Sequence, residues 1–363
     1  MYGLKQAGRM WSKRLVEVLV NNVGMTQSKS DPCVFRLEKN GVVDMILCVH
    51  VDDVIVAGKS VKCDSLFAAL RAEFQTTRGE LKWYLGCAFW RDIVRGVVRI
   101  TQRTFVDTVV KRFDVETESN LPASQQADLG PRREDEDLSD KPVRSAVGSL
   151  IWLSGMTRPY IPSAVREVAK HAHNPSDRFW KAVVKIISYL KRTKDLGLVF
   201  ERGRDLNLSV YVDADYADKS NWRRSVSGVA VMLGGSVVSA TSTTQHCVTL
   251  STSEAEYVAM AQGAKAALFT RAVLEFLQPQ LSGRIITMFE DNQGAKAMAE
   301  NPTSAGRSKH IDVRYHFIRQ LIAREILRVE YKKGEDQPAD ILTKPLERGS
   351  FERHRRFLMN LPE

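Results

Sequence analysis

Four acidic residues stand where short apolar segments end or where a helix is expected to begin. They are Asp213 in SVYVDADYAD, Glu256 in STSEAEY, Asp291 in FEDNQ and Asp340 in QPADILTK. Hard divalent cations prefer oxygen ligands, so carboxylates at such positions are candidate metal ligands. A single acidic residue is more often a solvated surface group. The order and context of the four together indicate a metal site.

The chemistry available to such a site is phosphoryl transfer. If the strands that carry Asp213 and Asp291 are neighbours, the four carboxylates converge and repel one another unless cations neutralise them. We therefore expect two Mg²⁺ ions, with Mn²⁺ as the alternative, held by Asp213, Glu256, Asp291 and Asp340. Two ions about 3.5–4 Å apart can activate a water and stabilise the leaving oxygen of an in-line displacement.

Two of these positions have an acidic neighbour, so a choice between close pairs is needed. Glu254 and Glu256 are two residues apart and cannot share a helix face. Glu256 begins the periodic run EYVAMAQGA, whereas Glu254 lies at capping distance and favours the helix N-terminus. We take Glu256 as the ligand and Glu254 as the capping acid. We prefer Asp213 to Asp215 because Asp213 completes the strand pattern.

A second acidic pair, Asp52 and Asp53, lies between the β-branched, apolar segments VVDMILCVH and VIVAG. These segments predict a strand pair with a turn at Val51-Asp52-Asp53. Aspartate is a favoured turn residue, which is the simpler interpretation. Between two strands this apolar, however, the turn would be held rigidly, and the paired carboxylates could bind a metal.

The elements that must position Asp213, Glu256, Asp291 and Asp340 follow from the hydrophobic pattern. Three sequential strands and then alternating helices and strands predict a mixed sheet flanked by helices. The expected strands are 208–213, 228–233, 236–242, 285–290 and 326–331, and the expected helices are 253–277, 292–300, 311–324 and a final one near 337–343. Residues 116–142 are polar and contain three prolines, which is typical of a linker.

The overall composition narrows the class of protein. With 363 residues the chain can form two or three domains. It has no apolar run of about 18 residues and no secretory signal pattern, so we expect no membrane association. The five scattered cysteines indicate reduced thiols and an intracellular protein. The net charge of +10 favours a polyanionic partner such as nucleic acid.

Nine segments carry a resemblance to one family. The chain resembles the C-terminal part of the Pol polyprotein of copia-type LTR retrotransposons, in which a reverse transcriptase is followed by a ribonuclease H. The matching segments are YGLKQAGRMW (2–11), HVDDVIVAG (50–58), GELKWYLG (79–86), VGSLIWLSGMTRP (147–159), YVDADYAD (211–218), STSEAEYVAM (251–260), EDNQGAKAMAENP (290–302), SKHIDVRYHFIR (308–319) and QPADILTKPL (337–346).

The resemblance implies a multidomain chain of α/β and α+β class. It would comprise a truncated reverse-transcriptase palm, a helical thumb or connection region, and a ribonuclease H-like mixed sheet with flanking helices. The expected parts are a reverse-transcriptase region at 1–115, the linker at 116–142, a helical connection at 143–200, a ribonuclease H domain at 201–346 and a basic C-terminal tail at 347–363.

The resemblance also implies an activity. The family's ribonuclease tetrad maps onto Asp213, Glu256, Asp291 and Asp340, which implies Mg²⁺-dependent hydrolysis of the RNA strand of RNA–DNA hybrids. The polymerase carboxylate pair maps onto Asp52 and Asp53. Nucleic acid is the implied partner, alongside other Pol and Gag products. The implied location is a cytoplasmic virus-like particle, the nucleus, or both. Candidate nucleic-acid-binding residues are Lys5, Gln6, Lys309, His310 and Arg314, although a surface helix with ordinary basic residues would look the same at the last three.

Departures from the family pattern support an alternative. The family's polymerase uses a further metal-binding aspartate upstream of YGLKQ, so we expect nucleotide addition to be lost in this chain. His50 stands in place of a usual Tyr, and TSTTQ (241–245) in place of frequent lysines. The alternative is a non-catalytic, nucleic-acid-binding relic of a decayed element. A third hypothesis is an inert fragment that scarcely folds.

Overall fold

The chain forms two compact units, neither of which is a continuous stretch of sequence. The computed structural model describes residues 5–217, 223–301 and 309–362, and the side chains of 316–362 but not of 309–315. The N-terminal unit comprises Met1–Leu85 and Leu268–Gly283, and the C-terminal unit comprises Gly86–Ala267 and Arg284–Glu363. This mixed α/β architecture confirms the predicted fold class. The predicted domain boundaries at 115, 142, 200 and 346 stay predictions.

The N-terminal unit is built on an antiparallel sheet of order β1-β2-β3-β4. One face of the sheet buries Phe35 and Leu47 against Leu19 and Leu66 of the helical segments. The elements are α1 (Ala7–Glu17), a π-helical turn η1 (Val18–Asn22), β1 (Thr26–Gln27), β2 (Val34–Lys39), β3 (Val42–His50), β4 (Asp53–Gly58), α2 (Ser60–Glu73) and β5 (Trp83–Tyr84).

The predicted turn between β3 and β4 is present, and its backbone is unusual. The last paired residues are His50 and Asp53, and Val51 between them has a φ of 58°. A β-branched residue in this left-handed region is a genuine outlier. The indole nitrogen of Trp11 donates to the Val51 carbonyl at 2.8 Å, which fixes the turn against α1.

The C-terminal unit contains a five-stranded mixed sheet of order β11-β10-β9-β12-β13. Strand β10 is antiparallel to β9 and β11, whereas β12 is parallel to β9 and β13. The strands are β9 (Ser209–Asp215), β10 (Val226–Leu233), β11 (Ser236–Thr244), β12 (Ile286–Glu290) and β13 (Leu327–Tyr331). A separate antiparallel set joins β6 (Cys87–Asp92), β7 (Val97–Thr101) and β8 (Leu198–Glu201).

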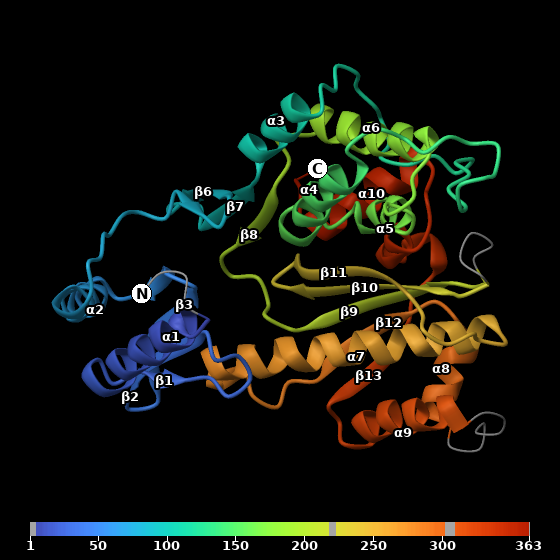
Figure 1. Cartoon of the computed structure of the whole chain (residues 1–363). Helices are drawn as coiled ribbons and strands as arrows, with labels where there is room; N and C mark the ends of the chain where they lie inside the picture. Colours follow the sequence, from blue (N-terminus) through green and yellow to red (C-terminus); the bar gives the residue numbers. More distant parts are fainter. Residues whose placement is uncertain (1–4, 218–222, 302–308, 363) are drawn as a thin grey trace. The chain divides into compact units, whose positions relative to one another are not determined.

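Helices cover both faces of the five-stranded sheet (Figure 1). On one face, Gly263 of α7 (Thr252–Leu277) lies against Val210, Val212 and Met288. On the other, Tyr211 joins a core formed largely by helices.

The remaining described helices of the whole chain are α3 (Arg103–Arg112), α4 (Val143–Met156), α5 (Pro162–Ala169), α6 (Asp177–Arg192), the 3₁₀ helix η3 (Pro279–Leu281), α8 (Gln293–Glu300), α9 (Lys309–Ala323), the 3₁₀ helices η5 (Gly334–Asp336) and η6 (Pro338–Leu342), and α10 (Arg348–Met359). None of the described helices is long and apolar enough to cross a membrane.

The segment 116–142 has no helix or strand, yet it is held against the rest of the C-terminal unit. The Lys191 ammonium donates to the Glu116 carbonyl at 2.6 Å, and the Arg178 guanidinium forms an ion pair with Glu136 at 2.6 Å. Leu121 and Leu129 pack against the helical core. The polar composition of this segment therefore coexists with defined contacts along its length.

Two elements near the C-terminus differ from the expected ones. The helix expected near 337–343 is the 3₁₀ helix η6, and residues 347–363 contain α10. Phe351, His354 and Leu358 of α10 are buried on one face. Their spacing of three and four residues is typical of a helix. The many arginines around them make the segment polar on average, and for this reason the sequence predicted a basic tail.

The contact between α7 and the sheet predicts an asymmetric response to alanine. A Cβ on Gly263 would lie 2.5 Å from Val212 Cγ1, whereas a Cβ on Gly148 of α4 meets no atom within 4 Å. We expect Gly263→Ala to lower the free energy of unfolding by about 1–3 kcal/mol because it overpacks this interface. Gly148→Ala should raise it by up to about 1 kcal/mol through helix propensity. Thermal unfolding of both variants checks this, and equal shifts would contradict it.

Candidate metal centre

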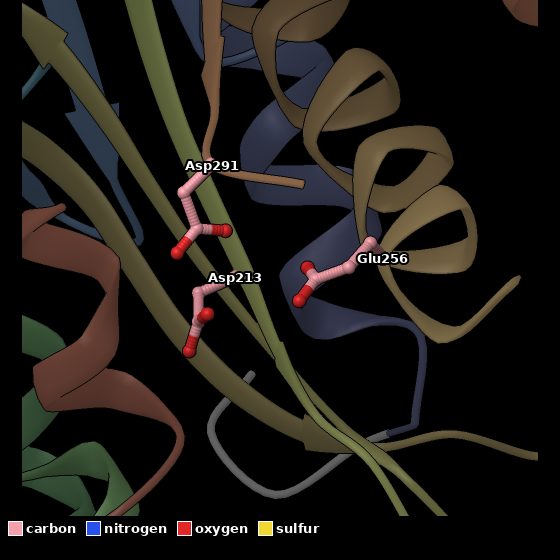
Figure 2. A group of neighbouring side chains, drawn as sticks. All are labelled: Asp213, Glu256 and Asp291. Carbon is pink, nitrogen blue, oxygen red and sulfur yellow. The ribbon is translucent and has the colours of Figure 1, made fainter. Parts of the chain in front are cut away.

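Three carboxylates converge at one end of the five-stranded sheet (Figure 2). Strands β9 and β12 are parallel, and their last paired residues are Tyr211 and Phe289. Asp213 and Asp291 each follow two residues after that pair, so the parallel register brings them to the same edge. Glu256 reaches the same place from the first turns of α7.

The first turn of α7 is capped, which fixes the position of Glu256. The Ser251 hydroxyl oxygen accepts the Glu254 N–H at 3.2 Å, and the Glu254 carboxylate accepts the Leu250 N–H. This reciprocal arrangement is a variant of the capping box, and it confirms Glu254 as the capping acid. The Gln245 amide donates to the Ala255 carbonyl at 2.8 Å and so ties the same turn to the end of β11.

The distances between the three carboxylates suit a shared cation. One oxygen each from Asp213, Glu256 and Asp291 lies within 4.8 Å of the others. Asp213 and Glu256 are buried, with 3% and 6% of their surfaces exposed, and Asp291 is half-buried. Among the described residues, no other set of three His, Cys, Asp or Glu side chains comes together in this way.

Burial and mutual repulsion make these carboxyl groups hard to ionise. Burial raises the pKa of Asp213 to about 7, with a further contribution from the Asp340 charge. Burial also raises the pKa of Glu256, and the charges of Glu290 and Asp213 add to the rise. The pKa of Asp291 is raised by burial and then by Asp340. The positive charge near the cluster is therefore too small to balance the negative charge that its three carboxylates would carry.

Glu290 is a fifth carboxylate that the sequence analysis missed. It is fully buried, one oxygen accepts the Asn292 N–H at 2.9 Å, and its other oxygen has no hydrogen-bond partner among the described residues. Burial raises its pKa well above the usual range. Glu290 could have been predicted from the alternation of buried and half-buried positions along β12, because Ile286, Met288 and Glu290 lie on one buried face.

Asp340 lies beside the cluster rather than within the 4.8 Å set. It stands on η6 and forms an ion pair with Lys344 at 2.9 Å. Burial opposes the charge on Lys344, but the nearby Asp213 and Asp340 outweigh it and raise the lysine pKa. The Thr343 hydroxyl, also at the end of η6, donates to Asp213. Lys344 is thus a cation beside these acids that the sequence analysis did not single out.

Gln337 is a third residue that the sequence analysis missed, and its side chain binds backbone carbonyls. Its buried amide donates to the Val212 carbonyl at 3.0 Å and to the Phe289 carbonyl at 3.2 Å. The Val212 carbonyl, in β9, comes directly before Asp213, and the Phe289 carbonyl, in β12, comes two residues before Asp291. Gln337 therefore holds the ends of the two strands together.

The residues present fit a divalent cation. Glu256 Oε2 is buried and has no hydrogen-bond partner among the described residues. A buried carboxylate oxygen without a donor is costly unless a cation binds it. Oxygens that bind one Mg²⁺ at about 2.1 Å lie up to about 4.2 Å apart, so the observed limit of 4.8 Å needs only a small adjustment or a second ion. Asp213, Glu256 and Asp291 would hold the metal, with Asp340 adjacent.

The other predicted site residues lie elsewhere or outside the described residues. Asp52 and Asp53 are exposed at the β3–β4 turn, and Lys5 and Gln6 are exposed directly before α1. The side chains of Lys309, His310 and Arg314 lie outside what the structure describes. Their predicted roles stay predictions.

Comparisons with known proteins place the chain in a family. A family model described as reverse transcriptase (RNA-dependent DNA polymerase) matches residues 1–124. The retrovirus-related Pol polyprotein from transposon TNT 1-94 of Nicotiana tabacum is 32% identical over 97% of this chain and 27% of the relative. That from transposon RE2 of Arabidopsis thaliana is 33% identical over 97% of this chain and 24% of the relative. The chain belongs to the copia-type Pol polyproteins.

This Pol chain spans about a quarter of the length of these curated relatives. Among solved structures, it is similar to the foamy viral protease–reverse transcriptase in complex with an RNA/DNA hybrid. The identity is 12%, the TM-score is 0.50, and the match covers 92% of this chain and 39% of that one. The likeness supports the fold alone, and it agrees with the predicted palm and ribonuclease H-like regions.

The raised pKa of Glu256 predicts how stability depends on pH without metal. A carboxyl whose folded pKa is raised stabilises the fold below its unfolded pKa, and this contribution is lost as the pH rises toward the folded pKa. Glu256→Gln removes that titration. We therefore expect the variant to gain Tm over the unmodified chain in EDTA, with a gain that grows between about pH 5 and pH 8.

Added Mg²⁺ should raise the Tm of the unmodified chain more than that of Glu256→Gln, because binding to the folded state stabilises it. Glu300→Gln, at an exposed glutamate of α8, is the matched control. If it reproduced the pH-dependent gain, the effect would not belong to the cluster.

The position of Gln337 predicts a stability loss. Gln337→Leu would leave the Val212 and Phe289 carbonyls without this donor, and we expect the free energy of unfolding to fall by about 1–3 kcal/mol. Gln320→Leu, at an exposed position of α9, should change it by less than about 0.5 kcal/mol. Urea unfolding of the two variants measures the difference, and an equal effect would argue against the bridging role.

Proposed function

We propose that the C-terminal unit of this Pol chain hydrolyses the RNA strand of RNA–DNA hybrids with Mg²⁺ as cofactor. The observation that carries the proposal is the convergence of Asp213, Glu256 and Asp291 from three separate elements. The first two are buried, and the group is short of positive charge. A cluster of this kind is a poor structural device, because its members repel one another at short range. It is a suitable binding site for divalent cations.

Each residue would have a distinct task. Asp213 and Asp291 are held rigidly by paired strands, and Glu256 by a capped helix, so their oxygens would need little reorganisation to bind metal. Bound Mg²⁺ would supply an activated water and would stabilise the leaving oxygen of a phosphodiester. Thr343 would keep Asp213 oriented through its hydrogen bond. Asp340 would complete the tetrad, and its present partner Lys344 would be free to contact a phosphate once the metal shares the negative charge.

The substrate class follows from charge and family. The chain carries a net charge of +10, which favours a polyanion. The foamy viral structure, similar in fold, is of a complex with an RNA/DNA hybrid, and a hybrid is also the substrate that the copia-type resemblance implies. These points support the choice of RNA–DNA hybrid over other nucleic acids.

A second candidate is a nucleic-acid-binding relic without turnover. It is favoured by the segment TSTTQ (241–245), which lacks the lysines that are frequent there in the family, and by the departure at His50. Asp52 and Asp53 are exposed, and among the described residues no third His, Cys, Asp or Glu joins them in a metal-binding group. Loss of nucleotide addition in the N-terminal unit stays a prediction.

Cleavage of a labelled hybrid by the purified chain tests the proposal. We expect cleavage with Mg²⁺, none with EDTA, and a loss of more than about 100-fold in Asp291→Asn, because even a residue that only supports a metal ligand contributes 10–100-fold. Asp205→Asn makes the same chemical change at an exposed residue paired with Arg284 and should leave the rate unchanged.

Each outcome separates the two candidates. Cleavage that survives Asp291→Asn at the level of the control would refute the role of the cluster. Binding of the hybrid without Mg²⁺-dependent cleavage, in a chain that unfolds cooperatively, would favour the relic.

A further inference from the structure

Arginines converge on a cavity of about 530 Å³ in the C-terminal unit, apart from the carboxylate cluster. Three come from α10, namely Arg353, Arg355 and Arg356, and Arg99 comes from β7. The cavity also contains Leu196 and is bounded by Pro362 near the end of the chain. Its volume is within the range of about 300–1,000 Å³ that is usual for ligand pockets.

None of the four arginines forms an ion pair with a carboxylate among the described residues. Arg355 donates to the Tyr189 hydroxyl at 2.6 Å, and Arg356 to the Pro362 carbonyl at 2.9 Å. Arg353 donates to the Glu335 carbonyl. Among the residues that the structure describes, the Arg99 side chain has no hydrogen-bond or carboxylate partner, and its buried Nε is unpaired, as is the Nε of Arg355.

The acid that lines the cavity does not balance this charge. Glu352 is already paired with Arg348 at 2.9 Å, outside the lining. Buried guanidinium donors without partners are costly, and like charges around one cavity repel one another. Both costs fall when an anion binds between them.

The simpler interpretation is that these arginines form the solvated face of a surface helix. Arg353 and Arg356 do share a face of α10 with Gly349 and Glu352, opposite the buried Phe351. Arg99 and the half-buried Arg355 do not fit that interpretation, because they come from another element or another face and have buried donors.

We propose that this arginine cavity binds phosphate groups of a nucleic-acid strand. Arginine presents a planar fork of donors that matches phosphate geometry, and Arg99 and Arg355 still have unpaired donors to offer. The cavity and the carboxylate cluster belong to the same unit, and Arg353 contacts the Glu335 carbonyl five residues before Asp340. A hybrid cleaved at the cluster would thereby gain a second, sequence-independent anchor. The choice of nucleic acid as the polyanion rests on the proposed function.

Salt-dependent binding of a labelled RNA–DNA hybrid in EDTA tests the proposal without cleavage. Arg99→Gln/Arg355→Gln is compared with Arg91→Gln/Arg324→Gln, which removes the same charge from exposed positions outside the cavity. We expect the cavity variant to bind more weakly and its plot of log K against log salt to be shallower by about 2, one unit for each lost phosphate contact. The control should keep the slope of the unmodified chain.

Arg353→Gln/Arg356→Gln, at two exposed side chains, guards against misfolding of the first variant and should show a similar loss of slope. Thermal unfolding verifies that each variant is folded. If both cavity variants bind the hybrid like the control, the proposal is overturned.

Two further probes test other anions. Inorganic phosphate that stabilises the unmodified chain in a manner dependent on Arg99, without any change in hybrid binding, would show a site for a free anion and overturn the proposal. Arg99-dependent binding to vesicles that contain phosphatidylserine, without any such effect on hybrid binding, would also overturn it. Loss of hybrid cleavage in Asp291→Asn with an unchanged salt slope would bear on the proposed nuclease and leave the arginine site standing.

Discussion

Like charges confined at one end of the mixed sheet repel one another, and the C-terminal unit is built to hold them together. Asp213, Glu256 and Asp291 offer oxygens within 4.8 Å of one another, and burial deprives them of the water that would screen them. Their raised pKa values express that cost. The repulsion must be opposed by the rest of the unit until a cation binds.

The opposing structure consists of hydrogen bonds and packing behind the carboxylates. The parallel register of β9 and β12 sets the distance between two of them, and Gln337 bridges the carbonyls at the strand ends. The close fit of Gly263 against Val212 keeps α7, and with it Glu256, near the sheet. Each device uses backbone groups or rigid side chains, so the acids are held without needing to contact cationic partners.

The residues of this arrangement that could be predicted are those marked by local sequence patterns. Strand ends located Asp213 and Asp291, and the capping distance separated Glu254 from Glu256. Glu290 could have been predicted from the alternation of β12, where a buried position simply happens to be acidic. Gln337 could not, since its acceptors are carbonyls 125 and 48 residues away. The arginine cavity is equally hidden, because Arg99 meets α10 only through tertiary structure.

The division of the chain into units has a consequence for the order in which they can be completed during synthesis. Leu268–Gly283 belongs to the same unit as Met1–Leu85, and there the Arg36 guanidinium lies 4.8 Å from the centre of the Phe276 ring and donates to the Phe276 carbonyl. Domains commonly fold in sequence as they leave the ribosome. Here the N-terminal unit cannot be completed until Leu268–Gly283 has been translated, which is after most of the C-terminal unit. A ribosome that stalled before Leu268 would therefore carry an incomplete N-terminal unit.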